Sequence, residues 1–370
     1  YGLLNYATYY EARAASPSFR PRFRFFDRRL SLAGTIACFG AMLAINPITG
    51  GTAIAILLGI HQYLRRLDRP QRWADASRSY HFQRAKESIR AMTAEASNPR
   101  SWRPQVLAFS ADPYRRERLL RFASWLEGSS GLTAAVEIVV GEGAIKRRER
   151  AERETLLEAQ IDELDLDVHA RAVLAPDAME ALPVIVQSFG LGPLEANTVL
   201  FGWPEVNEDH HLLGYAQAVR EIHRIGVHVV SMVSDEQRWA ALDAFPENGR
   251  RIDVWWQDDD ASRLALLTAY LFTRTRKWSH SKIRVLGTAE AVENRAEVED
   301  TLFAMLTDVR IPADVHCVVT PSIDAIASTS GDAAFVFVPM TLHRTEFVGP
   351  YKLRTADVLD RLPSCAGVLA

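Results

Sequence analysis

Three consecutive aspartates, Asp258–Asp260, are the residues whose spacing points most directly to chemistry, and they follow two tryptophans in the stretch IDVWWQDDD. Grouped carboxylates can hold a metal ion or serve as general acids and bases. Within residues 252–256, however, apolar side chains alternate with Asp253 and Trp255, which indicates a strand with large residues on both faces. Aspartate after such a strand is a preferred N-cap, because its carboxylate accepts from free backbone N–H groups. The stretch therefore predicts a buried strand and a capped helix rather than a metal or acid/base site.

Two pairs of glycines are candidates for a phosphate-binding turn, which needs free backbone N–H groups at the start of a helix. Gly141 and Gly143 follow an expected strand and open an expected helix, so they are the better candidate for a cofactor phosphate. Gly190 and Gly192 precede a strand instead, and neither pair has the Lys-Ser/Thr ending of a phosphate loop. The pair His210-His211 is typical of a solvated polar surface. We expect no catalytic residue, metal or cofactor in this chain, and therefore no enzyme.

From Arg103 onward, short β-branched runs alternate with helical segments. These elements must position the aspartates and glycines described above. Such runs predict a mostly parallel α/β sheet covered on both faces. Five strands are expected in each of two halves, residues 103–240 and 241–370, which indicates an internal duplication. The mixed-sign stretch 146–167 is expected to be a solvated helix. The expected strands are 106–111, 134–140, 168–174, 198–203 and 227–233, then 252–256, 283–287, 315–319, 334–338 and 367–369.

The segment from Leu30 to Leu64 carries no formal charge, apart from a possible proton on His61. Its 35 residues exceed the roughly 20 that one span needs, and Asn46-Pro47 interrupts it. We therefore expect a transmembrane helical hairpin over residues 30–65. A buried hairpin in a soluble core is the alternative, but such helices normally show a charged face. His61 fits either a role in ion or proton passage or simple packing near the interface.

Arginines flank this segment on both sides and predict its orientation. Arg28 and Arg29 precede it, Arg65 and Arg66 follow it, and the turn between the helices is uncharged. Because excess arginine stays on the cytoplasmic side, both ends are expected in the cytosol. Residues 1–29 are then the end of a preceding membrane helix and a cytoplasmic loop.

Residues 66–102 are expected to connect the membrane part to the sheet through an amphipathic helix. Its apolar stripe is Ala85, Ile89, Met92 and Ala96. A helix that lies on its own domain and a lever that contacts a partner both remain open.

Composition excludes some classes of protein. The net charge is −3, but residues 1–72 carry +7 and the remainder −10, a split that does not favour nucleic-acid binding. The widely spaced Cys38, Cys317 and Cys365 fit a reducing compartment and no disulfide framework. Tyr1 in place of Met, together with the apolar C-terminal run, indicates a piece of a longer protein.

Five stretches, in order along the chain, are similar to those of the cation–chloride cotransporters, specifically the last two membrane helices and the carboxy-terminal cytosolic domain. They are SPSFRPRFRFFDRRLSLAG (16–34), SWRPQVLAFS (101–110), GLGPLEANTVLFGW (190–203), RIDVWWQDDD (251–260) and RTRKWSHSKIRVLG (274–287). The residues that carry the resemblance in the cytosolic part are Arg103, Pro104, Gly190, Gly192, Asn197, Thr198, Asp253, Trp255, Trp256, Asp259, Asp260, Trp278 and Arg284.

The resemblance implies a multi-pass cell-membrane carrier that moves chloride with sodium or potassium electroneutrally. It implies a cytoplasmic domain of two halves, each similar to the universal stress protein fold, that forms a homodimer and regulates transport. The ion sites would lie in earlier helices. One departure is Ala261-Ser262, where the family usually has two glycines. The alternatives are a membrane-tethered, nucleotide-sensing universal-stress-protein-like domain, and a soluble hydrolase with residues 30–64 in its core.

Overall fold

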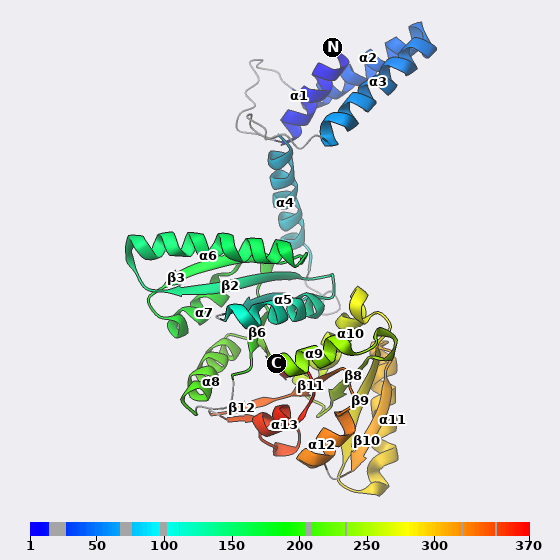
Figure 1. Cartoon of the computed structure of the whole chain (residues 1–370). Helices are drawn as coiled ribbons and strands as arrows, with labels where there is room; N and C mark the ends of the chain where they lie inside the picture. Colours follow the sequence, from blue (N-terminus) through cyan, green and yellow to red (C-terminus); the bar gives the residue numbers. More distant parts are fainter. Residues whose placement is uncertain are drawn as a thin grey trace. The chain divides into compact units, whose positions relative to one another are not determined.

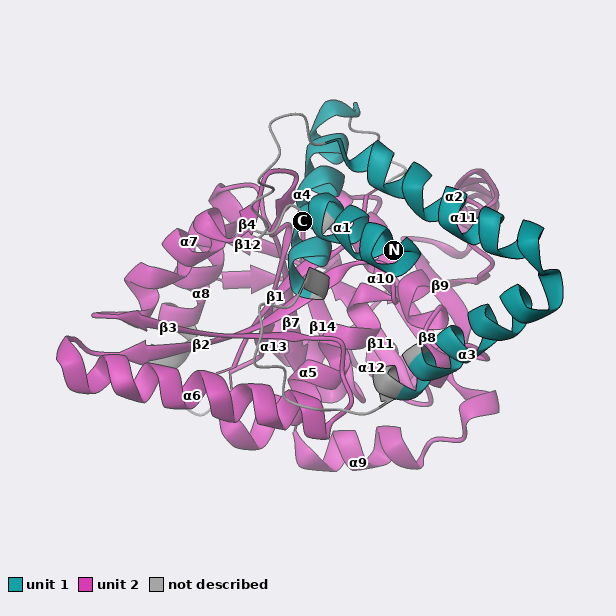
Figure 2. Cartoon of the chain, turned by 90° about the horizontal axis from the view of Figure 1, so that it is seen from above, with its two compact units in different colours: residues 1–96 teal, residues 97–370 magenta. Residues whose placement is uncertain are grey.

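The computed structural model describes residues 1–14, 27–66, 76–96, 102–110, 112–204, 209–233, 235–319, 321–344 and 346–370. The chain divides into two compact units, residues 1–96 and 97–370 (Figure 2). Each unit is considered by itself below.

The first unit contains four helices, α1 (Gly2–Ala14), α2 (Arg28–Ile45), α3 (Pro47–Arg66) and α4 (Ala76–Ala94) (Figure 1). Asn46 separates α2 from α3, as the sequence predicts. Its backbone N–H donates to the Met42 carbonyl at 3.3 Å, which ends α2. Its side-chain Oδ1 accepts from the N–H groups of Ile48 and Thr49 at 3.2 and 3.1 Å, which caps α3. Proline at the first position of α3 favours the same break, because that position needs no N–H donor.

Among the described residues, α2 is the one helix long and apolar enough to cross a membrane. Only 6% of it is buried, which disagrees with a helix in a soluble core. The apolar part of α3 is shorter and covers Pro47–Ile60. Two spans were expected. By length and composition, α2 meets the requirement for a span and the described part of α3 does not.

The apolar stripe expected on the connector is not the face by which α4 packs. Of its members only Ile89 is partly buried, whereas Ala85, Met92 and Ala96 are exposed. The α4 helix contacts α1 instead through Tyr80, whose ring stacks on that of Tyr10 at a centroid distance of 5.5 Å. A stripe that packs on its own domain therefore disagrees with the structure, whereas a stripe that contacts a partner stays a prediction.

The second unit is built on one ten-stranded sheet in the order β10-β9-β8-β11-β14-β7-β6-β1-β2-β3. Each half has the strand order 3-2-1-4-5 when its strands are counted along the chain. Every neighbouring pair is parallel except β14 and β7, which join the two halves in antiparallel fashion. The strands are β1 (Gln105–Phe109), β2 (Leu132–Val140), β3 (His169–Ala175), β6 (Thr198–Gly202), β7 (His228–Val233), β8 (Arg251–Trp255), β9 (Lys282–Ala289), β10 (Asp314–Val319), β11 (Phe335–Pro339) and β14 (Cys365–Leu369).

All ten expected strands are present, and the mostly parallel α/β fold is confirmed. The two halves share one sheet, so the structure groups them as a single compact unit. A boundary near residue 240 stays a prediction. Two short hairpins were not expected: β4 (Gly190–Leu191) with β5 (Leu194–Glu195), and β12 (Thr341–His343) with β13 (Glu346–Val348).

Helices cover both faces of the sheet and enclose two apolar clusters. The first cluster receives side chains from α5 (Pro113–Glu127), α6 (Gly143–Glu163), α9 (Glu236–Ala244), α10 (Asp260–Thr273) and α11 (Arg295–Val309). The second receives them from α7 (Ala178–Ser188), α8 (Asp209–Arg224), α12 (Ile323–Ser330) and α13 (Thr355–Arg361). As expected for a solvated helix, α6 buries only Leu157 and Ile161.

Candidate functional site

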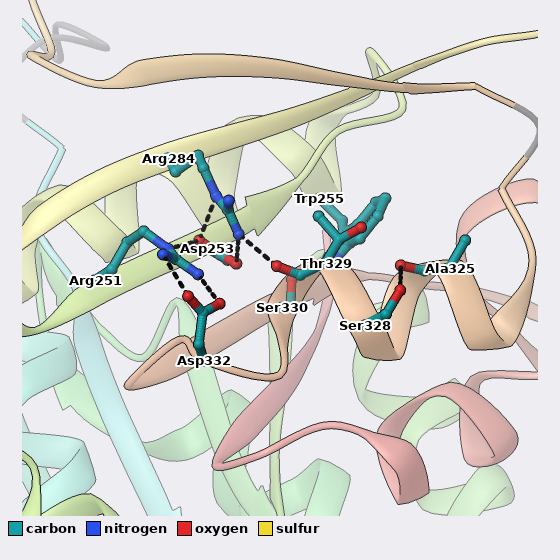
Figure 3. A network of polar contacts seen from close by, with 9 residues as sticks. All are labelled: Arg251, Asp253, Trp255, Arg284, Ala325, Ser328, Thr329, Ser330 and Asp332. Carbon is teal, nitrogen blue, oxygen red and sulfur yellow. Dashed lines mark hydrogen bonds and ion pairs between the residues drawn. The ribbon is translucent and has the colours of Figure 1, made fainter.

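The most extensive polar cluster around the predicted motif residues is centred on Asp253 in β8 (Figure 3). Asp253 is completely buried and lies in register with Arg284 of β9. Arg284 donates two hydrogen bonds to this carboxylate, from Nε to Oδ1 at 3.0 Å and from Nη2 to Oδ2 at 2.6 Å. A two-pronged arginine–carboxylate pair of this kind is among the strongest polar contacts in proteins. The structure thus brings together two motif residues that lie far apart in the sequence.

Two further residues, Arg251 and Asp332, extend the cluster toward the start of β8. Arg251 stands two residues before Asp253 on the same strand face, and its Nε donates to Asp253 Oδ1 at 3.0 Å. The Arg251 guanidinium also pairs with Asp332, at 3.1 Å between Nη1 and Oδ2. The hydrogen bond from Arg251 lowers the pKa of Asp332, and the same bond raises the pKa of Arg251. Two arginines and two carboxylates balance, so the cluster is electrically neutral.

The cluster connects three separate elements. Arg284 Nη2 also donates to the carbonyl of Thr329 in α12 at 2.7 Å, and Asp332 follows that helix (Figure 3). Strands β8 and β9 are thereby tied to α12 and to the turn before β11. Both oxygens of Asp253 are occupied by arginine donors, so this carboxylate is not free to act as a base or a metal ligand. The arrangement is a structural clamp.

Each of the three aspartates in the turn after β8 has a partner within the same turn or the first turn of α10. Asp259 caps α10, because its Oδ1 accepts from the Ser262 N–H at 2.8 Å and from the Ser262 hydroxyl at 2.6 Å. Asp258 and Asp260 both pair with Arg263, at 3.0 and 3.1 Å. The cap is the one that the sequence predicts.

The departure Ala261-Ser262 has a structural consequence at this turn. Ser262 is fully buried, and its hydroxyl accepts from the Gln257 N–H at 2.9 Å. The serine side chain therefore fills the turn and ties its two ends together. Glycine at this position offers no hydroxyl for either contact.

Three tryptophans of the predicted motif set lie in the core, on both sides of the sheet. Trp255 and Trp278 are fully buried, and Trp256 is nearly so. Trp255 lies on the α12 side, where its Nε1 donates to the Ser330 hydroxyl at 3.2 Å. Trp256 and Trp278 belong to the opposite cluster. These side chains shape the fold and face no site.

Asn197 joins the motifs at residues 101–110 and 190–203. Its Nδ2 donates to the Arg103 carbonyl at 2.8 Å, and its Oδ1 accepts from the Gln105 N–H at 2.9 Å. The Thr198 hydroxyl donates to the same Oδ1 at 2.9 Å. This side chain therefore holds the start of β1 beside the start of β6. Pro104 lies between the two anchored residues.

Gly190 and Gly192 form the β4–β5 hairpin, and both have positive φ values, of 124° and 63°. A Cβ on Gly190 would lie 2.0 Å from the Leu194 carbonyl oxygen, so this turn requires glycine. The pair serves a tight turn and not a phosphate.

Gly141 and Gly143 occupy the expected place between β2 and α6. The Gly141 N–H donates to the Ala175 carbonyl at 2.9 Å, so it is not available to a phosphate. Gly143 has a φ of 90° and open space around its Cα. Of the two glycine N–H groups that the sequence suggests for a phosphate, only that of Gly143 therefore remains a candidate.

The arginines that are expected to flank a membrane lie at helix ends. Arg28 and Arg29 are the first two residues of α2 and are exposed, and Arg65 and Arg66 are the last two of α3. The side chains of Arg65, Arg66, His61 and His210-His211 lie outside the described part of the structure.

Sequence reasoning missed Arg251 and Asp332. The spacing of Arg251 and Asp253 was a usable sign, because residues two apart share one face of a strand. Asp332 could not be found in this way, since it reaches the cluster from a turn 81 residues away in the chain. Within the described residues, no group of three or more His, Cys, Asp or Glu side chains is arranged to hold a metal ion.

Two comparisons with known proteins bear on this geometry. Residues 227–336 match the family model of Solute carrier family 12. The structure is similar to a crystal structure of the cytoplasmic domain of a prokaryotic cation chloride cotransporter, with a TM-score of 0.51 and 13% sequence identity. That similarity covers 72% of this chain and 96% of the other, and at this identity it shows the fold alone. The family match supports the resemblance of this chain to the cation–chloride cotransporter family, and the crystal structure shares its fold.

Proposed function

We propose that this chain supplies the regulatory and assembly part of a membrane carrier that moves chloride together with sodium or potassium, electroneutrally. The ion sites would lie in membrane helices outside these 370 residues. Helices α2 and α3 would form a hairpin in the membrane, with both ends in the cytosol, and residues 103–370 would form a cytoplasmic domain.

The observation that carries the proposal is the segment matched by the family model. It runs from the start of β7 to β11 and includes all four members of the Asp253 cluster. The match therefore falls on strands β7 to β11, which include the strands that carry the Asp253 cluster. Only 6% of the α2 window is buried in this chain, which supports the placement in a membrane.

A homodimer is proposed for the same protein. Large apolar side chains are exposed on helices of both halves, including Ile145 on α6 (84% exposed) and Phe303 on α11 (66% exposed). Exposed apolar side chains of this size favour association, and most soluble assemblies of identical chains are two-fold symmetric. Native mass spectrometry of the whole chain in detergent should give twice the mass of one chain. A single-chain mass at micromolar concentration would contradict the dimer.

Transport is tested in proteoliposomes that contain the natural protein carrying this sequence. Uptake of radioactive chloride should rise with an inward gradient of sodium or of potassium, and it should not change when a membrane potential is imposed. Uptake that no cation stimulates would overturn the proposal.

The regulatory role is tested by ending the same protein after residue 102. Because the ion sites are proposed to lie elsewhere, the chloride concentration for half-maximal uptake should stay the same while the maximal rate changes. A variant with normal expression and an unchanged maximal rate would show that residues 103–370 do not regulate transport.

A further inference from the structure

A basic pocket lies entirely within the first unit, between α1, α2 and α4. Its volume is about 750 Å³. Four arginines and a single glutamate, Glu87, form its charged lining, and two tyrosines add polar hydroxyl groups. The arginines are Arg13, Arg28, Arg29 and Arg84, and the tyrosines are Tyr9 and Tyr80.

Helix packing brings these side chains together from three separate segments. A Cβ on Gly34 of α2 would lie 2.8 Å from the Asn5 side chain of α1, so the two helices touch closely there. Gly2 lies against Cys38 and Phe39, further along α2, which means that α1 and α2 run antiparallel. The last turn of α1 therefore meets the first turn of α2. The stacked rings of Tyr10 and Tyr80 bring α4 to the same end.

Among the described residues, the four arginines of this pocket outnumber the nearby carboxylates of Glu87 and Asp27, the second of which accepts from the Arg29 backbone N–H at 2.7 Å. No ion pair joins Arg28, Arg29 or Arg84 to a carboxylate in the described part of the chain. The Arg13 guanidinium lies over the Tyr80 ring, 5.5 Å from its centroid, and donates to the Tyr9 hydroxyl at 3.4 Å. These contacts orient Arg13 without cancelling its charge.

The single acid and the local helix dipole do not offset this excess. Glu87 accepts a hydrogen bond from Gln83 at 3.1 Å. Arg28 and Arg29 stand at the positive end of the α2 dipole, where a cation is unfavourable, and Asp27 is the one carboxylate that caps this end among the described residues. An anion in the pocket would relieve the repulsion among the four arginines.

The chemistry of the lining suits an anion with several oxygens, such as a phosphate. Guanidinium groups match the oxygens of a phosphate with paired hydrogen bonds. The first turn of α2 lines the pocket, and the first turn of a membrane span lies at the level of the lipid headgroups. The arginine-rich side of a span is the cytoplasmic side, whose leaflet carries anionic lipids. We propose that this pocket binds the phosphate headgroup of an anionic phospholipid, an inference that rests on the membrane placement of α2 proposed above.

The test uses native mass spectrometry of the whole 370-residue chain in detergent, titrated with phosphatidylglycerol or with phosphatidylcholine. The native chain should bind phosphatidylglycerol about tenfold more tightly than phosphatidylcholine. The double variant Arg29→Gln/Arg84→Gln should lose about tenfold in that affinity, because two cations near a headgroup are removed. The matched control, Arg78→Gln/Arg90→Gln, removes two exposed arginines of α4 from outside the pocket lining and should change affinity by less than about twofold.

Two results would overturn the headgroup site: equal affinity for the two lipids, or an equal loss in both double variants. Inorganic phosphate added in about tenfold excess over lipid separates the sources, since acyl chains add binding energy that free phosphate lacks. Displacement of phosphatidylglycerol by phosphate would assign the pocket to a soluble anion and overturn the lipid proposal. Extraction with alkaline carbonate tests the membrane placement separately: the native chain and both variants should stay in the membrane fraction. Release of the native chain would overturn that placement and the lipid site with it.

Discussion

Asp253 and Arg284 face each other in register across β8 and β9, and the arginine occupies both oxygens of the buried carboxylate. Asp253 belongs to the motif at residues 251–260 and Arg284 to the motif at residues 274–287. Their contact therefore joins these two motifs in the fold. A buried carboxylate is tolerable only when it is paired, because an isolated charge in the core is very unfavourable. The pair therefore specifies the register of two neighbouring strands.

Replacing Asp253 with Ala should destabilise residues 97–370 by about 3 kcal/mol, because Arg284 and Arg251 would lose their shared partner in a mostly buried site. Urea unfolding followed by tryptophan fluorescence measures the loss. Asp332→Ala is the matched control. Its side chain is 75% exposed, so its removal should cost less than about 1 kcal/mol. Equal losses would show that the buried pair is not the centre of the cluster.

Trp255→Ala should destabilise the same unit by about 3–5 kcal/mol, since the ring is fully buried and its removal leaves a cavity. Trp255→Phe keeps most of the ring volume but leaves the Ser330 hydroxyl without its donor, at a cost of about 1 kcal/mol beyond the change in packing. Tyr114→Ala, at a side chain that is 90% exposed, should stay within about 0.5 kcal/mol. Thermal unfolding by circular dichroism ranks the three. An unchanged melting curve for Trp255→Ala would contradict its place in the core.

Asn197→Ala should cost about 2 kcal/mol, because the Gln105 N–H and the Thr198 hydroxyl both lose their acceptor. Hydrogen exchange should show faster exchange at the start of β1, where the lost bond held the chain. The control is Asn248→Ala, an exposed position, for which neither stability nor exchange should change. A variant that exchanges as slowly as the native protein would show that β1 needs no support from Asn197.

Glu127→Gln should stabilise the protein at neutral pH and have no effect in acid. Burial raises the pKa of Glu127 above the ordinary value of 4.5, while the hydrogen bond from Thr133 opposes the rise. A raised folded-state pKa means that the folded state holds this proton more tightly, so the native protein loses stability as the pH rises from 4.5 through the folded value. Glutamine removes that loss. Unfolding free energies measured across this range should diverge as the pH rises. An exposed control, Glu158→Gln, should show no such trend.

Most of the fold was predictable because it depends on local pattern. Alternating and continuous apolar runs predict all ten strands of the sheet, and Asn46-Pro47 predicts the break between α2 and α3. The cap at Asp259 follows from its position between a strand and a helix. The packing partner of α4 was left open, because periodicity identifies an apolar stripe but not the partner that covers it.

Little of the candidate site was predictable in the same way. The resemblance marked Asp253 and Arg284 as important, but it placed neither against the other. Arg251 and Asp332 were overlooked, and the arginine pocket of the first unit combines residues from three helices that no single motif contains.

By itself the sequence determined the elements, the charge-free segment with its flanking arginines, and the family resemblance, because each depends on residues that are neighbours in the chain. The tertiary structure alone decided that β14 joins β7 to make one continuous sheet, and that four charged residues spread over 82 positions form one neutral cluster. The physical reason is that strand order and the pairing of buried charges depend on contacts between residues remote in sequence. Such contacts are selected by the whole core and not by any local stretch.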